Sequence, residues 1–246
     1  MMAQARSIAV SLSDKRKNED GSNGANALVM NAGTENDTVA AGVSSSILEE
    51  YIGCCASMGL RPSSVVLRMV LEHQAAPQRL TTLQLHHTYM GDSGTAALGR
   101  CLATTLPFLR ALSLANNGVG NDGVAALSAG ISEKARLPAV HAGQVLPLLV
   151  LDLSHNSKIT RAGGQALLNT ASRISSRLSL ISLVGTRVTD YFESRIIRHC
   201  ANTFDALSEN DQQLVYDLGR ELGLIADDDA AQMATGAGSR SDSVAR

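Results

Sequence analysis

Residues 148–156 read LLVLDLSHN, and this stretch contains the spacing that decides the fold: Leu148, Leu151, Leu153 and Asn156, or L-x-x-L-x-L-x-x-N. The same spacing occurs in LTTLQLHHT (80–88), LRALSLANN (109–117) and LSLISLVGT (178–186), with Thr or Asn in the last position. The first leucines of the four copies are 29, 39 and 30 residues apart. A period of this length predicts stacked supersecondary units.

Each copy divides into two halves. The alternating leucines predict a short strand, and a Gly and a small-apolar pair follow in the first three copies, as in Gly123 and Ala126-Leu127. We expect helices to begin near N-cap residues, which are Asp92, Asn121 or Asp122, Thr160 and Thr189. Parallel strands need a crossover connection, which is right-handed by rule, and the helices provide it.

The four copies resemble leucine-rich repeats of the ribonuclease-inhibitor type. This resemblance implies an α/β fold: a right-handed leucine-rich-repeat solenoid in a short horseshoe arc, with a parallel sheet on the concave side, helices on the convex side and helical caps. The fourth copy departs from the pattern, with Phe192 in place of Gly and Arg195 in place of Ala. The segment before the first repeat also resembles flagellar and cytoskeletal leucine-rich repeat proteins.

The repeats and their flanks predict five regions. An open apolar end of a solenoid needs a cap, and polar, aperiodic tails do not bury enough surface to fold. A ten-residue excess before the third strand predicts a projecting loop. The regions are a disordered tail at 1–43, a helical N-terminal cap at 44–79, four repeats at 80–204 with an insertion at 133–147, a capping helix at 205–226, and a disordered tail at 227–246.

Opposed charge blocks flank the last repeat. Residues 157–200 carry seven Lys or Arg against two acids, whereas residues 201–230 carry eight acids against one Arg. We expect these blocks to attract each other and to steer the C-terminal helix onto the last repeat, with modest energy at physiological salt.

The residues at the end of each strand predict a structural loop ladder. An Asn buried there can satisfy backbone groups of its own loop and of the neighbouring loop, and Thr can do part of this. The members are Thr88, Asn117, Asn156 and Thr186.

Outward side chains of the strands line up on the concave face, which is the broad concavity of such a coil. We interpret the polar ones as a candidate partner-binding surface. These residues are Gln84, His86, His87, Ser113, Asn116, Asp152, Ser154, His155 and Ser182.

The segment from Gly118 to Gly123 reads G-x-G-x-x-G between a strand and a helix, as in dinucleotide-binding folds. The repeat period already explains these glycines, because Gly91 and Gly94 occupy the matching loop. No acid follows at the ~20-residue spacing that a ribose would require. We therefore predict no cofactor. Ser-His-Asp, Cys-His and metal-ligand spacings are also absent from the sequence, which predicts neither catalytic residues nor a metal site.

The composition favours a protein partner over a nucleic acid or a membrane. The 246 residues have a formal net charge of −2, 3% aromatics and no Trp, and their four cysteines follow no disulfide or metal spacing. We expect a non-enzymatic protein-binding module or assembly scaffold that uses the concave face, the 133–147 insertion, or both. We expect it to be cytoplasmic, in a cytoskeletal or flagellar setting. The alternative is a regulator of an enzyme, such as a GTPase-activating or inhibitor-type leucine-rich repeat protein. The sequence leaves open the oligomeric state, and whether the N-terminus is a short organellar targeting segment.

Overall fold

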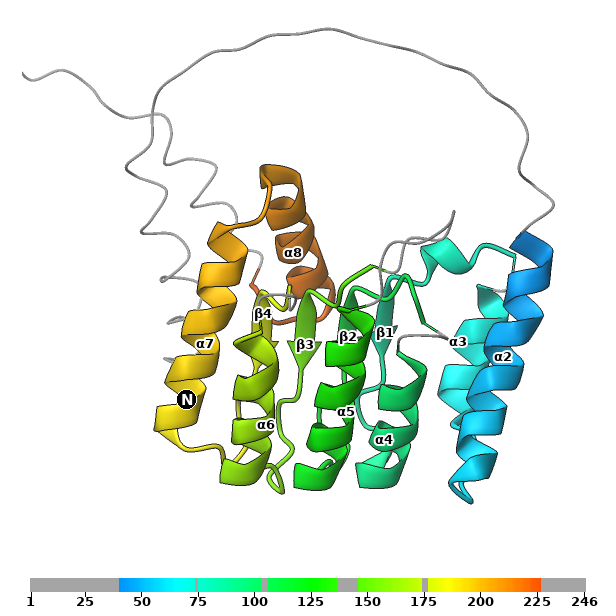
Figure 1. The fold of residues 1–246 in the computed structure, drawn as a ribbon, viewed down its shortest axis with the longest axis horizontal. Helices are drawn as coiled ribbons and strands as arrows, with labels where there is room; N and C mark the ends of the chain where they lie inside the picture. Colours follow the sequence, from blue (N-terminus) through cyan, green and yellow to red (C-terminus); the bar gives the residue numbers. More distant parts are fainter. Residues whose placement is uncertain (1–39, 74, 103–105, 137–145, 174–176, 227–246) are drawn as a thin grey trace, which may run out of the picture.

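The structure is a computed structural model that describes residues 40–73, 75–102, 106–136, 146–173 and 177–226. Strands and helices alternate from β1 to α7, and further helices lie at both ends (Figure 1). In chain order the elements are α2 (Ala40–Ser57), α3 (Ser64–Glu72), η2 (Pro77–Arg79), β1 (Thr82–Gln84), α4 (Gly91–Cys101), β2 (Ala111–Ser113), α5 (Asn121–Lys134), β3 (Val150–Asp152), α6 (Arg161–Ala171), β4 (Leu180–Ser182), α7 (Asp190–Asp205) and α8 (Glu209–Glu221).

The four strands form one parallel sheet in the order β1-β2-β3-β4. Equivalent residues of the repeats pair directly: Leu83 with Leu112, Leu112 with Leu151, and Leu151 with Ile181. The rows on either side are Thr82, Ala111, Val150 and Leu180, and Gln84, Ser113, Asp152 and Ser182. Strand alternation predicts both rows, and the register confirms them.

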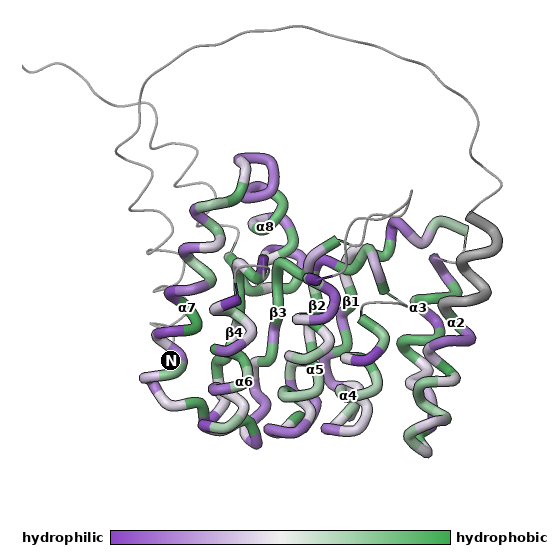
Figure 2. Tube along the Cα trace, viewed as in Figure 1, coloured by the Kyte–Doolittle hydropathy of each residue, from purple (hydrophilic) through white to green (hydrophobic). Residues whose placement is uncertain are grey.

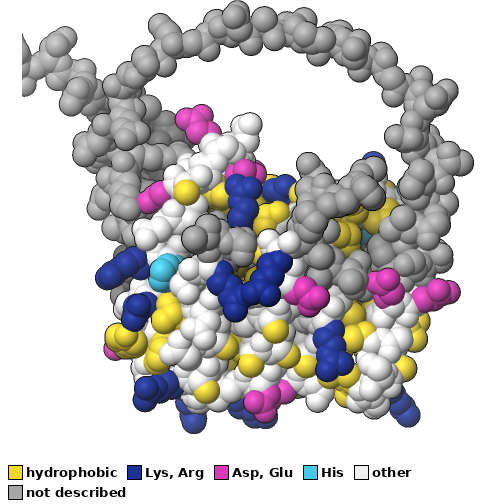
Figure 3. Space-filling view, in the orientation of Figure 1, with side chains coloured by type: hydrophobic (Ala, Val, Ile, Leu, Met, Phe, Trp, Pro, Cys, Tyr) yellow, Lys and Arg dark blue, Asp and Glu magenta, His cyan; other side chains and the backbone are white. Residues whose placement is uncertain are grey.

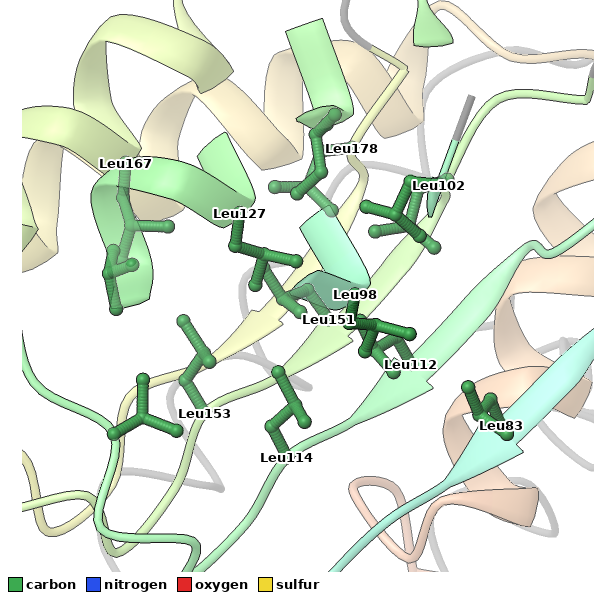
Figure 4. Close-up of a cluster of buried hydrophobic side chains, with 14 of the residues drawn as sticks. Leu83, Leu98, Leu102, Leu112, Leu114, Leu127, Leu151, Leu153, Leu167 and Leu178 are labelled. Atoms are coloured by element: carbon green, nitrogen blue, oxygen red, sulfur yellow. The ribbon is translucent and has the colours of Figure 1, made fainter. Parts of the chain in front are cut away.

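The repeated leucines fill the space between the sheet and α4–α6. Leu83, Leu112 and Leu151 point from the strands toward this layer, where they meet Leu98 and Leu127 of the helices (Figure 4). All five are completely buried. Each buried leucine contributes about 2 kcal/mol through removal of apolar surface from water. The leucines of all four repeats belong to one cluster, so the core is continuous along the coil.

Helices α2 and α3 cover the first repeat, and α2 begins at Ala40, before the predicted start of the cap at residue 44. The apolar stripe of α2 includes Tyr51, which is buried and accepts a hydrogen bond from the Ser63 N–H at 3.2 Å. Burial raises the pKa of the Tyr51 hydroxyl. The tail predicted at 1–43 is therefore wrong at residues 40–43, which belong to α2. Residues 1–39 and the tail predicted at 227–246 lie outside the described residues.

Helix α5, the helix of the second repeat, ends at Lys134 and so extends two residues into the insertion predicted at 133–147. The Lys134 side chain is buried, and its Nζ donates to the carbonyls of Leu102 (3.3 Å), Leu106 and Pro107 (3.1 Å). Burial lowers the pKa of Lys134 to about 7, while the three carbonyls favour the charged form. Residues 137–145 of the insertion lie outside the described residues.

The C-terminal helix α8 does not cap the end of the last repeat. It lies on the side of the sheet opposite α4–α6 (Figure 1), where Val215 and Leu218 pack with Val150 and Leu180 in a second apolar cluster. The predicted charge attraction is realised through Arg177, which pairs with Asp211 at 3.3 Å.

That helix takes this position because its apolar stripe finds apolar partners in one row of the sheet. The row that contains Ala111, Val150 and Leu180 would otherwise face water on the concave side. Burial of both surfaces outweighs the local attraction between charge blocks, which is weak at exposed positions.

Candidate protein-binding surface

Helix α8 occupies the concave face on which the sequence places a partner. Four of the nine predicted surface residues are buried in the structure: Ser113, Asp152, Ser154 and Ser182. The Asp152 carboxylate accepts from the Ser113 hydroxyl at 2.7 Å and from the Ser154 N–H at 3.0 Å, rather than contacting His155. In this conformation Asp152 is hydrogen-bonded to Ser113 and Ser154, and a partner does not reach the four buried residues.

The first strand is also engaged by α8. Gln84 Nε2 donates to the Glu221 carbonyl at 3.0 Å, and Thr82 Oγ1 donates to the Glu221 carboxylate at 3.0 Å. At β2, Arg110 lies 3.6 Å from Asp211. The helix therefore contacts the sheet from β4 to β1.

The remaining predicted residues lie in a row on the loops that leave the strands. His86, His87, Asn116 and His155 are exposed there, and the Asn116 amide donates to His87 Nδ1 at 2.8 Å. In Figure 2 much of the chain at this edge of the molecule is hydrophilic.

Backbone geometry singles out the same row. His87, Asn116 and His155 have φ of 58°, 52° and 58°, in the left-handed region that favours glycine. The matching residue of the fourth repeat is Gly185, with φ 75°. A Cβ there would lie 2.8 Å from His155 Nδ1, so the glycine leaves room for the imidazole.

Tyr89 is a surface residue that the sequence analysis missed. Its φ is 55° and it is 89% exposed, whereas the matching residue of the second repeat is Gly118, with φ 69°. Alignment of Tyr89 with Gly118 is the sequence signal that could have identified it. We define the loop edge as His86, His87, Tyr89, Asn116 and His155.

Beneath the loop edge, the asparagine ladder ties each loop to the next. Asn117 Oδ1 accepts from Thr88 N–H (3.1 Å) and Met90 N–H (3.1 Å), and Asn156 Oδ1 accepts from Asn117 N–H (3.0 Å) and Val119 N–H (3.0 Å). The hydroxyls of Thr88 and Thr186 donate to carbonyls of their own loops, those of Leu85 and Leu183. The ladder therefore supports the exposed row from within.

The glycine motif is occupied by a side chain of the preceding repeat. Asp92 Oδ1 accepts from the backbone N–H groups of Gly120 and Gly123, where a bound phosphate would lie in a dinucleotide fold. A Cβ at Gly123 would lie 2.6 Å from Asp92 Oδ1. The glycines therefore make room for a carboxylate that belongs to the repeat itself.

The same contact recurs one repeat later and corrects the N-cap prediction. Asn121 Oδ1 accepts from Thr160 N–H and Gly163 N–H, both at 2.9 Å. The residues that directly precede α4, α5, α6 and α7 form no side-chain cap. Thus Asp92 and Asn121 cap the helix of the next repeat rather than their own, because stacking brings consecutive helix starts together.

The third repeat has Arg161 at the position of Asp92 and Asn121, and Arg161 has no acceptor oxygen. Its guanidinium lies 5.9 Å from the ring centre of Phe192, the residue that replaces the repeat glycine. At this junction a contact between a cation and an aromatic ring therefore stands where the earlier repeats have an acceptor oxygen and a glycine.

Within the described ranges, no group of three or more His, Cys, Asp or Glu residues is placed to hold a metal ion. A search of the same residues finds no helix long and apolar enough to cross a membrane. The thiols of Cys55, Cys101 and Cys200 are buried, and burial raises the pKa of Cys200 to about 12.

Comparison with known families supports the class of protein that this geometry defines. A family model described as "Leucine Rich repeat" matches residues 105–128 and 147–168, which contain β2 and β3 with the loops and helix starts that follow them. No curated protein matches the chain. The two matches and the four-stranded parallel sheet support a leucine-rich repeat protein folded as an α/β solenoid arc. Repeats of this class generally mediate protein–protein interaction, and such domains are typically non-catalytic.

Proposed function

We propose that this protein is a non-catalytic binding module, or assembly scaffold, that contacts a protein partner through the loop edge. The observation that carries the proposal is the exposed row of non-glycine residues in the left-handed region. The chain retains His87, Tyr89 and His155 there, although glycine occupies matching positions at Gly118 and Gly185.

The loop-edge residues with positive φ carry backbone strain. A non-glycine residue in the left-handed region costs about 1–3 kcal/mol, and Asn and His occur there more often than Tyr. Tyr89 combines this conformation with nearly full exposure, so burial within the chain does not offset its strain. Backbone strain of this kind clusters at binding sites, where a partner uses the side chain that the strain presents.

The concave residues Ser113, Asp152, Ser154 and Ser182 are less suited to a partner. To reach them a partner would have to displace α8 together with the connection from α7 to α8. It consists of Ala206 to Ser208, and Leu207 within it is buried in the second cluster. We therefore assign these polar residues to the interior.

Affinity capture from the native cell tests the proposal with a triple variant, His87→Gly/Tyr89→Gly/His155→Gly. Glycine relieves the strain but adds entropy to the unfolded chain, so we expect an unchanged or higher melting temperature. We also expect at least tenfold lower recovery of the partner that wild type captures. The matched control is Gln165→Ala/Asn169→Ala, a hydrogen-bonded exposed pair on α6. Equal recovery by the triple variant and wild type would contradict the proposal.

Three finer assignments remain proposals on the strength of the sequence alone. They are the ribonuclease-inhibitor subclass, a cytoplasmic location, and a cytoskeletal or flagellar setting. The repeat spacing of 29 and 30 residues in the regular copies supports the first. Localisation of a fluorescent fusion in the native cell tests the other two, and accumulation inside mitochondria or plastids would contradict both.

A further inference from the structure

The third and fourth repeats carry a cationic surface next to the loop edge. We define the basic surface as Lys158, Arg161, Arg187, Arg195 and Arg198, all of which are exposed. In Figure 3, Lys and Arg side chains gather at the left and lower left, over α7 and the loops that lead into α6 and α7. Lys158 follows His155 by three residues, so the two surfaces adjoin.

These five cations have no ion pair among the described residues. In the block from 157 to 200, Arg177 is the cation that pairs with an acid, and its partner Asp211 lies on the concave side. The acids in the block are Asp190 and Glu193, and burial together with Asp190 raises the pKa of the Glu193 carboxyl. The basic surface therefore keeps a local excess of positive charge on a chain whose net charge is −2.

Two of the guanidinium groups are held in place by aromatic rings. Arg195 lies 5.4 Å from the ring centre of Tyr191 and donates to its hydroxyl, and Arg161 lies over Phe192. The Tyr191 and Phe192 rings contact each other edge to face at 5.1 Å. A guanidinium that already contacts a ring loses less freedom when it binds a carboxylate than a free one does.

We propose that the basic surface binds an acidic segment of a protein partner. The proposal rests on the proposed function, because it names the chemistry of the partner that meets the loop edge. Carboxylates fit this surface, since Arg binds them with two parallel hydrogen bonds. A nucleic acid fits less well, because the whole chain has a net charge of −2 and only 3% aromatic residues on which bases could stack.

The test uses a fluorescein-labelled peptide of alternating Glu and Ser as the probe, with binding followed by anisotropy at low and physiological salt. The variant Lys158→Glu/Arg187→Glu/Arg198→Glu reverses three cations that are not stacked on aromatic rings. Each exposed pair contributes modestly on its own, and with three charges reversed together we expect at least a tenfold loss of affinity. Wild-type binding should weaken as salt rises.

The matched control is Arg68→Glu/Arg79→Glu/Arg100→Glu, which changes the net charge equally at exposed positions near the first repeat. Probe affinity within about threefold of wild type is expected for this control and for Lys158→Arg/Arg187→Lys/Arg198→Lys. Equal loss in the Arg68 control and the Lys158→Glu variant would overturn the proposal, since it would reflect net charge alone.

Three further arms separate other occupants. Tighter binding of wild type to a single-stranded RNA, or to phosphatidylserine vesicles, than to the peptide would overturn the proposal. A tenfold gain in probe affinity in Asp227→Asn/Asp228→Asn/Asp229→Asn would assign the surface to the chain's own acids instead, and would also overturn it.

The loop-edge triple should bind the probe as wild type does, which keeps the two proposals separable. Loss of the probe in the Lys158→Glu variant, with normal partner recovery by the loop-edge triple, would support the basic surface and contradict the loop edge. Normal probe binding by the Lys158→Glu variant, with poor partner recovery by the loop-edge triple, would support the loop edge and contradict the basic surface.

Discussion

Substitution of Asp92 tests whether consecutive repeats are held together by a shared carboxylate. Asp92 Oδ1 accepts from the N–H groups of Gly120 and Gly123, and both glycines are buried. Asp92→Ala removes the acceptor while leaving the α5 backbone in place. Two N–H groups at the first turn of α5 then lack a protein partner.

The expected cost is about 2 kcal/mol. Loss of an N-cap acceptor costs ~0.5–2 kcal/mol, and loss of a negative charge near a helix N-terminus costs a further ~0.3–1 kcal/mol. Partial access of water to the opened site keeps the total near the middle of that range. For a protein of this size the melting temperature should fall by about 4–8 °C.

Urea unfolding followed by far-ultraviolet circular dichroism measures the change, with an unchanged m-value showing that the folded state keeps its extent. Asp92→Asn retains an acceptor oxygen of the kind that Asn121 provides one repeat later, so we expect it to lose less than about 1 kcal/mol. Asp122→Ala removes an exposed acid from the first turn of α5, the turn that Asp92 caps, and should lower the unfolding free energy by less than about 0.5 kcal/mol. If Asp92→Ala and Asp122→Ala were equally stable, the shared-cap explanation of the glycine motif would be wrong.

Three further substitutions test the core, the C-terminal helix and the buried lysine. Leu151→Ala should lower the unfolding free energy by about 3 kcal/mol in a urea titration, and Leu151→Asp should abolish folding. Leu71→Ala changes a half-exposed side chain and should cost less than about 1 kcal/mol in the same titration. Equal losses for the two Ala variants would refute the assigned core. Leu218→Ala should cost about 2–4 kcal/mol in thermal unfolding, because Leu218 is buried between α8 and the sheet, and a loss below about 0.5 kcal/mol would mean that α8 is not held there. Since the pKa of Lys134 falls to about 7 from 10.5, the unfolded chain binds a proton between these values that the folded chain lacks. The stability of wild type relative to Lys134→Met should therefore rise with pH from about 7 upward, by at most about 1.4 kcal/mol per pH unit, and a pH-independent difference between the two unfolding curves would contradict the pKa.

Strand positions were predictable because the leucine spacing is local and recurs in every unit. The alternation that places Leu112 inward and Ser113 outward needs no information from distant residues. The ladder of Asn117 and Asn156 follows from the same argument, because the period itself brings the ends of consecutive strands together.

The caps of the repeat helices were predicted with the right residue types and the wrong partners. Asp92 and Asn121 are acceptors at helix starts, as their chemistry suggests. Each binds the helix of the following repeat, however, because the helix starts are neighbours across the stack. Which helix is capped depends on spacing between repeats, which the residue types do not specify.

The candidate surface was predicted less well than the fold. Alternation places Gln84, Ser113, Asp152 and Ser182 correctly on one face of the sheet, yet three of these four are buried. Their exposure depends on α8, and the sequence of an amphipathic helix does not specify which surface the helix will cover. The apolar row of Ala111, Val150 and Leu180 was the available signal.

The sequence by itself determined the repeating unit of this protein: a leucine-lined strand, a loop closed by Asn or Thr, and a helix. Contacts within one period are sufficient to select that unit. The tertiary structure alone decided that α8 fills the concave face and that His87, Tyr89 and His155 stand exposed on the loop edge. Both outcomes depend on apolar burial and backbone geometry between segments far apart in the chain, and a local pattern does not encode them.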